Sequence, residues 1–293
     1  MQDILFIVLG LVLLIAGGNW LLKAAVALSL KLNIPKIVIG MTVVSFATSA
    51  PELIVSVNAA LEGFPDLALG NVVGSNIANL GLVLAITVIL GSIEVRKSFY
   101  TTDWPVMMLA SFLFFVFIYF DGELQRYEGF IMFLVLFVFL VYLLRFQKTA
   151  VVDELPEDDV PLPLYKTVLF LGLGGLALWG GSELLIKGAV GLATFYGVSE
   201  RVIAVLKKEK AISLGNLIGS NIFNLLAVLG ITSMITPIKV LDQGLLTNDI
   251  FWMLGTSFLI LPLVFLPKGL RLGWRDGAIL LSVYVLFVYL TIT

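Results

Sequence analysis

The sequence contains no cysteine and no histidine among its 293 residues. Without cysteine, the chain has no thiol nucleophile, no disulfide and no thiolate ligand for zinc. Without histidine, it lacks the side chain that most often acts as a general acid or base near neutral pH. These two absences argue against hydrolases and intramembrane metalloproteases.

Charge is also scarce, because only 13% of the residues are charged and the formal net charge is −2. Such a small charge gives no reason to expect a nucleic-acid partner. By contrast, 60% of the residues are hydrophobic and the mean hydropathy is +1.08. A soluble domain of this length has too small an interior for so much apolar surface, whereas lipid solvates it. We therefore expect an integral membrane protein.

Nine apolar stretches are long enough to cross about 30 Å of hydrocarbon as α-helices. They cover residues 3–30, 37–61, 67–93, 104–120, 128–146, 164–196, 211–235, 247–266 and 275–292. The fold class predicted is all-α and polytopic. The polar stretch 147–163 carries five acidic residues among prolines, and it divides the chain into halves at 1–146 and 164–293. We expect this stretch to be an acidic cytoplasmic linker.

The positions of lysine and arginine indicate an orientation, but they require a tenth span. If the N-terminus lies outside and each half has five helices, thirteen of these residues fall in cytoplasmic loops and three in outer loops. This asymmetry is typical of membrane proteins, whose cytoplasmic loops are rich in basic residues. We expect a prokaryotic cytoplasmic (inner) membrane as the location.

The two halves repeat each other, and the repeat locates the missing span. Residues 16–39 match 180–203 at an offset of 164, whereas Gly70–Asn79 match Gly215–Asn224 at an offset of 145. The difference of 19 residues falls between Ile203 and Ala204. The second half is therefore predicted to lack most of its second helix. Five spans per copy is an odd number, so the copies should be inverted, with a substrate site near the membrane midplane.

Glu52 is the first candidate for a binding residue, because it lies near the middle of an otherwise uncharged apolar segment. An ionised carboxylate there is costly unless a cation or a proton offsets it. Pro51 has no N–H and frees a carbonyl one turn earlier, around Ser45. The hydroxyls of Thr48 and Ser49 are close in sequence. Oxygen ligands without nitrogen or sulfur suit hard cations such as Ca²⁺ and Na⁺. The alternative is a protonated Glu52 that only packs.

The Gly70–Asn79 motif and its repeat supply the second group of candidates. Ser75 and Asn79 are four residues apart and share a helix face, and Ser220 and Asn224 repeat this pair. The amides and hydroxyls could complete a cation site, although the glycines of the motif are also typical of close helix contacts. Elsewhere, Glu183 and Lys187 are spaced for an intrahelical ion pair. Asp103, Asp121, Asp249 and Asp276 lie near span ends, where interfacial placement is expected.

These motifs resemble the alpha repeats of the sodium/calcium exchanger family, within the cation/calcium antiporter superfamily. Ala47-Thr48-Ser49-x-Pro51-Glu52 and the Gly70–Asn79 motif are similar to the first alpha repeat, and Gly215–Asn224 to the latter part of the second. The resemblance implies that Glu52 is the main Ca²⁺ ligand, and that Na⁺ sites include neighbouring carbonyls and side chains. The implied ligand set is Ser45, Thr48, Ser49, Glu52, Ser75, Asn79, Ser220 and Asn224. The counterpart of Glu52 falls within the 19 missing residues.

The function implied is exchange of Ca²⁺ for Na⁺ by alternating access, impaired in this form of the chain. A Ca²⁺/H⁺ antiporter of the same fold is the nearest alternative, and a channel or a membrane scaffold that does not transport is a more distant one. An enzyme is the weakest option, because no nucleophile and base are visible together. The partners expected are Ca²⁺, Na⁺ or H⁺ and the lipid bilayer, with no resident cofactor.

The chain as it stands is predicted to bind Ca²⁺ poorly and not to exchange it, because a lone carboxylate faces a divalent ion with half of the oxygen ligands missing. Radioactive Ca²⁺ uptake into proteoliposomes measures this directly. Robust Na⁺-dependent uptake by this 293-residue chain would overturn the prediction.

Overall fold

The structure is a computed structural model that describes residues 2–31, 45–146, 162–196, 214–266 and 269–292. In these ranges, eight helical runs are long and apolar enough to cross a membrane, and a shorter apolar helix covers Ser49–Leu61. The predicted all-α, polytopic architecture is confirmed. The expected linker, except for its last two residues, and the junction between Ile203 and Ala204 lie outside the described residues.

The helices of the two halves correspond one to one, apart from the second span. The first half contains α1 (Gln2–Lys31), α3 (Ser45–Leu61), α4 (Pro65–Ala78), η2 (Asn79–Leu84), α5 (Ala85–Leu90), η3 (Phe99–Asp103), α6 (Trp104–Asp121) and α7 (Arg126–Phe146). The second contains α8 (Leu164–Tyr196), α10 (Leu214–Phe223), η4 (Asn224–Leu229), α11 (Gly230–Ile235), η5 (Leu245–Asp249), α12 (Ile250–Phe265) and α13 (Trp274–Ile292). Within the described ranges, α3 has no counterpart in the second half.

Four of the spans contain a π-helical segment, which the hydrophobic pattern did not predict. The segments η2 and η4 begin at Asn79 and Asn224, 145 residues apart, and η3 and η5 are likewise related by 146 residues. π-Helical turns are rare and frequently mark functional sites. Their repetition at matching positions indicates a feature of the repeat, not a local irregularity.

Two short antiparallel β-pairs join the halves. Strand β1 (Ile93–Glu94) pairs with β4 (Arg271–Leu272), and β2 (Glu123–Leu124) pairs with β3 (Ile238–Lys239). Because β1 corresponds to β3 and β2 to β4 in the repeat, the same contact is made twice. Such reciprocal contacts are those of two units related by a two-fold axis. The predicted inverted repeats are confirmed. These strands were missed because two residues carry no periodicity.

The two central spans lie inside the protein and the others face outward. In the most apolar window of Pro65–Leu90 and of Leu217–Ile235, 78% of the residues are buried, compared with 17–44% in the other spans. The outer helices expose large apolar side chains, including Phe112, Phe130, Phe137, Trp179, Phe258 and Tyr289. Lipid solvates such surfaces without free-energy cost. The recurring Ser-Asn pairs, Ser75 with Asn79 and Ser220 with Asn224, are on these central spans, shielded from lipid.

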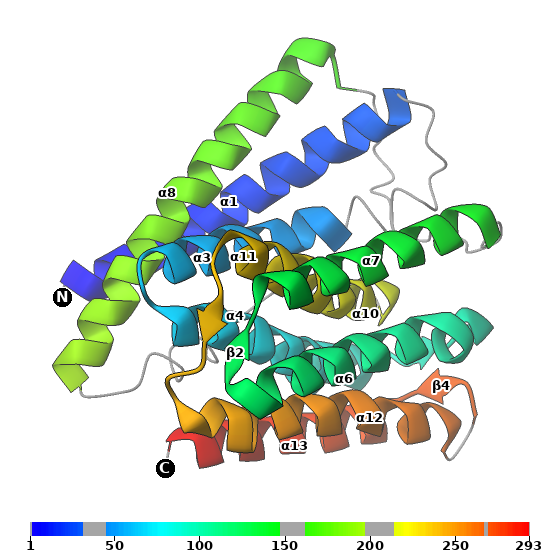
Figure 1. Cartoon of the computed structure of the whole chain (residues 1–293). Helices are drawn as coiled ribbons and strands as arrows, with labels where there is room; N and C mark the ends of the chain where they lie inside the picture. The colour runs from blue at the N-terminus through cyan, green and yellow to red at the C-terminus, as the bar shows by residue number, and fades with distance from the viewer. Residues whose placement is uncertain (1, 32–44, 147–161, 197–213, 267–268, 293) are drawn as a thin grey trace.

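The long helices α1 and α8 lie side by side and run at a slant to the remaining helices (Figure 1). Glycines on each helix permit this close contact. A Cβ added at Gly10 would lie 2.7 Å from the carbonyl oxygen of Gly181, and one added at Gly17 would lie 2.8 Å from that of Gly174. The two contacts are equivalent at the offset of 164. The backbones of α1 and α8 therefore come into close contact at Gly10, Gly17, Gly174 and Gly181, which we call the glycine track.

Gly181→Leu is expected to lower the free energy of unfolding by about 1–3 kcal/mol, because its side chain would overpack the backbone of α1. The measurement is equilibrium unfolding in detergent micelles. Gly180→Leu is the matched control, since a Cβ there meets nothing within 4 Å. Equal effects of the two substitutions would show that the glycine track does not hold the pair together.

Candidate functional site

The candidate site is built on one polar face of α3. Ser45, Ser49, Glu52 and Ser56 follow one another at intervals of four, three and four residues, which places them on one side of an α-helix. All four are buried, and Glu52 is 6% exposed. The polar face of an otherwise apolar helix is therefore turned into the protein.

This face of α3 lies between elements of both halves. Ser49 Oγ donates a long hydrogen bond of 3.5 Å to the carbonyl oxygen of Ser220 on α10. Ser56 Oγ donates to the carbonyl oxygen of Ala68 on α4 at 3.3 Å. A Cβ added at Gly219 would lie 2.6 Å from Ser45 Oγ, so this hydroxyl packs directly on α10. α3 therefore closes the site from one side while the Gly-Ser-Asn motifs of the two halves form the other.

Asn71 on α4 is hydrogen-bonded to α3 at Glu52 and one turn later at Ser56. Its Nδ2 donates to Ser56 Oγ at 3.0 Å and to the backbone oxygen of Glu52 at 3.3 Å. Pro51 lies inside α3. Because Pro51 has no N–H, the carbonyl of Ala47 cannot receive the usual helical hydrogen bond. The predicted release of a carbonyl near Ser45 therefore agrees with a proline in mid-helix.

The carboxylate of Glu52 is incompletely satisfied. Its Oε2 is buried and has no hydrogen-bond partner, and within the described residues Glu52 forms no ion pair. A buried anionic oxygen without a partner is strongly unfavourable. No three acidic side chains gather into a metal-binding group in the described part of the chain. A cation bound here would depend on one carboxylate together with neutral oxygens.

Four buried asparagines form a reciprocal cluster where the halves meet. We call Asn76, Asn79, Asn221 and Asn224 the amide clasp. Asn224 Nδ2 donates to Asn76 Oδ1 at 3.0 Å, and Asn79 Nδ2 donates to Asn221 Oδ1 at 3.0 Å. Each of the four side chains is 1% exposed. The Oδ1 of Asn224 is buried without a partner. The clasp therefore leaves an oxygen available at the start of η4.

The predicted ligands lie on elements that pack together. Ser45, Ser49 and Glu52 are on α3, which contacts α4, α10 and η4. Ser75 and Asn79 are buried on α4 and at the start of η2, while Ser220 and Asn224 are buried at the corresponding positions of the second half. Thr48 is part of α3, but its side chain lies outside the described residues. Cation ligation by this set stays a prediction.

Four further polar residues contribute to the site although they were not among the predicted ligands: Ser56, Asn71, Asn76 and Asn221. Asn76 and Asn221 are equivalent at the offset of 145, and that repetition was the available signal. Ser56 was recoverable from its spacing to Ser49 and Glu52. Three of the four aspartates expected at the membrane interface have side chains that are buried within the protein. Asp103, Asp249 and Asp276 are near span ends, but they are 9%, 1% and 6% exposed.

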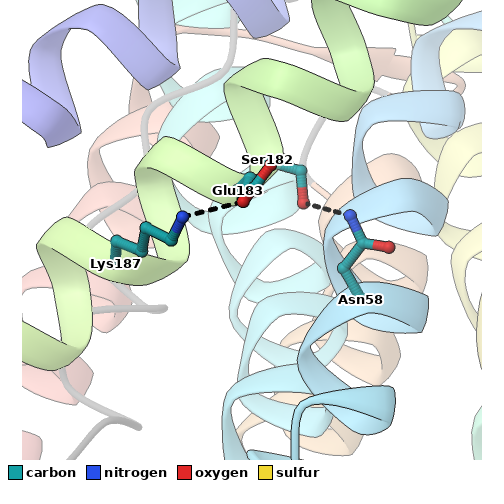
Figure 2. A network of polar contacts seen from close by, with 4 residues as sticks. All are labelled: Asn58, Ser182, Glu183 and Lys187. Atoms are coloured by element: carbon teal, nitrogen blue, oxygen red, sulfur yellow. Dashed lines mark hydrogen bonds and ion pairs between the residues drawn. The ribbon is translucent and has the colours of Figure 1, made fainter.

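Figure 2 shows the polar contacts between α3 and α8. Asn58 Nδ2 donates to Ser182 Oγ at 3.3 Å, which links the C-terminal part of α3 to the long helix α8. On the neighbouring turn, Lys187 and Glu183 form the predicted intrahelical ion pair at 2.7 Å. The side chain of Lys187 is 57% exposed. This ion pair is therefore separate from the candidate site.

Comparison with known proteins identifies similar chains. The family model described as sodium/calcium exchanger protein matches residues 3–145 and 201–293. CaxA of Alkalimonas amylolytica, named as an antiporter, is 34% identical over 312 aligned positions that cover 98% of this chain and 97% of the relative. The sodium/calcium exchanger MaX1 of Methanosarcina acetivorans is 26% identical over 98% and 97% of the two chains.

A solved structure of the sodium-calcium exchanger NCX_Mj, soaked with Na⁺ and Ca²⁺, has the same fold. Its TM-score is 0.62 at 22% identity, over 99% of this chain and 98% of the other. The alignment with CaxA is 19 positions longer than the 293 residues of this chain. At least that many residues of CaxA therefore have no counterpart here.

Asn71→Leu is expected to destabilise the protein by about 1–3 kcal/mol, because Ser56 and the backbone oxygen of Glu52 lose a buried donor. The free energy of unfolding in detergent measures the effect. Asn19→Leu is the control, since Asn19 is exposed on α1. Similar stability of the two variants would show that Asn71 does not hold α3 against α4.

Proposed function

The chain belongs to the sodium/calcium exchanger family, and on this basis we propose that it binds Na⁺ and Ca²⁺ in competition at the site centred on Glu52. The family match and the apolar helices together identify the chain as a multi-pass membrane protein related to cation antiporters. Exchange of Ca²⁺ for Na⁺ is the activity proposed for the complete two-repeat architecture, and we propose that it is impaired in this chain. One observation carries the proposal: a buried carboxylate oxygen without a partner belongs to the helix that packs against the motifs of both halves.

The chemistry of the site favours hard cations. The side chains around Glu52 offer hydroxyl and amide oxygens, and histidine and cysteine are absent from the whole chain. Such oxygen ligands suit Na⁺ and Ca²⁺ better than softer metals. A single carboxylate matches the charge of Na⁺ but only half that of Ca²⁺. We therefore propose that Na⁺ binding is retained in this chain and that Ca²⁺ binding is weak.

The proposed weakness for Ca²⁺ follows from the missing counterpart of Glu52. The offsets of the repeat place that counterpart among the 19 residues absent between Ile203 and Ala204. The longer alignment with CaxA supports this loss without locating it. Without the second carboxylate, a divalent ion must be bound by one charge and incomplete oxygen ligation.

Alternating access requires part of the protein to move past the site, and α1 with α8 is the pair proposed to do so. The glycine track brings the backbones of these helices into close contact, and side chains such as Leu21 and Ile7 of α1 pack on glycines of α8. α3 contacts both through a small apolar cluster of Leu14, Ala50, Val55, Leu178 and Leu185. The contact between Asn58 and Ser182 adds a polar tie. Movement of the pair would therefore be transmitted to the helix that carries Glu52.

Coupling to Na⁺ is favoured by the hydroxyls beside Glu52, and coupling to H⁺ remains the alternative because a protonated carboxyl would also be neutral. We propose the prokaryotic inner membrane as the location, with the N-terminus outside. In the ten-span arrangement of the repeat, thirteen basic residues fall in cytoplasmic loops and three outside, which supports this orientation.

Glu52→Gln is expected to lower Na⁺ affinity by at least about 100-fold, since losing the charged ligand should cost more than losing a group that supports one. Isothermal titration of the purified protein in detergent at fixed pH measures Na⁺ affinity. Glu62→Gln is the matched control, because Glu62 is exposed immediately after α3.

Unchanged Na⁺ affinity in Glu52→Gln would remove the basis of the proposal. If the unaltered chain binds no Na⁺, and Ca²⁺ releases protons in a manner that depends on Glu52, H⁺ replaces Na⁺ as the coupling ion. A chain that is indifferent to Na⁺, Ca²⁺ and Glu52→Gln alike would be a scaffold.

A further inference from the structure

An asparagine side chain can bind a cation only through the oxygen of its amide. The oxygen end is an acceptor that binds cations, whereas the nitrogen end carries two N–H donors that repel them. The two ends have nearly the same shape, so packing alone does not select between them. Asn79 and Asn224 therefore need a reason to present oxygen to the site.

The reason lies in the other two members of the amide clasp. Asn76 Nδ2 donates to the backbone oxygen of Asn221 at 3.3 Å, and Asn221 Nδ2 donates to the backbone oxygen of Asn76 at 3.1 Å. A backbone carbonyl can only accept a hydrogen bond. Each of these amides must therefore turn its nitrogen towards the opposite backbone, and its oxygen is left facing the other way.

The orientation of the Asn76 and Asn221 amides then determines the orientation of the predicted ligands Asn224 and Asn79. The Oδ1 of Asn76 faces Asn224, which has to present its Nδ2, and the observed distance is 3.0 Å. The Oδ1 of Asn221 likewise receives the Nδ2 of Asn79 at 3.0 Å. Asn224 Oδ1 consequently points away from the clasp, where it is buried and has no partner.

We infer that Asn76 and Asn221 are positioning residues that fix the oxygen ends of Asn224 and Asn79 towards the cation. This inference rests on the proposed function, because it assigns a role within the same site. Reversing one ligand amide would set oxygen against oxygen at the clasp. With all four side chains 1% exposed, water could not relieve that contact.

The hydrogen bonds that orient the ligand amides connect the two halves. Asn76 of the first half orients Asn224 of the second, and Asn221 of the second half orients Asn79 of the first. Both ligand amides stand where their helices change from α to π at η2 and η4. Neither half can therefore orient its own ligand amide alone. The site forms only when the two copies are docked.

The test compares Na⁺ affinity of the full chain with that of Asn76→Ala by isothermal titration in detergent. Loss of a group that orients a metal ligand typically lowers affinity about 10- to 100-fold, and this range is expected here. Asn19→Ala is the control, since Asn19 is an exposed asparagine on a membrane helix. Size-exclusion profiles and thermal unfolding establish that each variant is folded.

Repeating the Asn76→Ala substitution in a protein that already carries Asn224→Asp distinguishes orientation of the Asn224 amide from a general structural role of Asn76. A carboxylate has oxygen at both ends, so Asn224→Asp removes the need for orientation. When Asn224→Asp is already present, its carboxylate faces Asn76 Oδ1, so adding Asn76→Ala removes a contact between two oxygens and is expected not to lower Na⁺ affinity. If Asn76→Ala does not fold, Asn221→Ala in the presence and absence of Asn79→Asp applies the same test to the other half.

The outcomes distinguish this inference from the proposed function. An equal loss with and without Asn224→Asp, or an Asn76→Ala protein that binds Na⁺ normally, overturns the positioning role and leaves the proposed function standing. An unaltered chain that binds neither Na⁺ nor Ca²⁺ overturns both.

Discussion

The constraint on which the site depends is the free-energy cost of an anionic oxygen inside a protein that is itself surrounded by hydrocarbon. Glu52 is buried, one of its oxygens has no partner, and no basic side chain pairs with it in the described ranges. The neighbouring features meet this constraint. α3 turns its serines inward, Asn71 holds α3 at Glu52, and the amide clasp leaves an oxygen unpaired. Each supplies a neutral oxygen or fixes one in place.

Two-fold symmetry explains how a short motif builds a whole site. The β-pairs, the glycine contacts of α1 with α8 and the hydrogen bonds of the clasp all occur twice, once from each half. In an inverted pair of repeats, equivalent residues converge at the axis, where neither copy alone encloses a cavity. The absence of a described counterpart to α3 breaks this symmetry at the carboxylate. The amide clasp is therefore symmetric, whereas among the described residues the carboxylate of the candidate site comes from the first half alone.

The same architecture separates a rigid part from a part that can slide. The two central spans are mostly buried and are joined by buried amide hydrogen bonds, which favours a single arrangement. By contrast, α1 and α8 meet through glycine backbone and face largely outward. The contrast is suited to a protein whose ions stay at a fixed site while access to it changes.

The sequence by itself determined the membrane spans, the two inverted copies, Glu52 and the recurring Ser-Asn pairs, because each depends on local composition or on direct repetition along the chain. It did not predict the π-helical segments, the two-residue strands or the burial of Asp103 and Asp249. Asn76 and Asn221 recur at equivalent positions of the repeat, yet their role depends on hydrogen bonds across 142 residues or more. Which end of an amide faces a cation is decided by partners that meet only after the halves dock, and no local pattern records that contact.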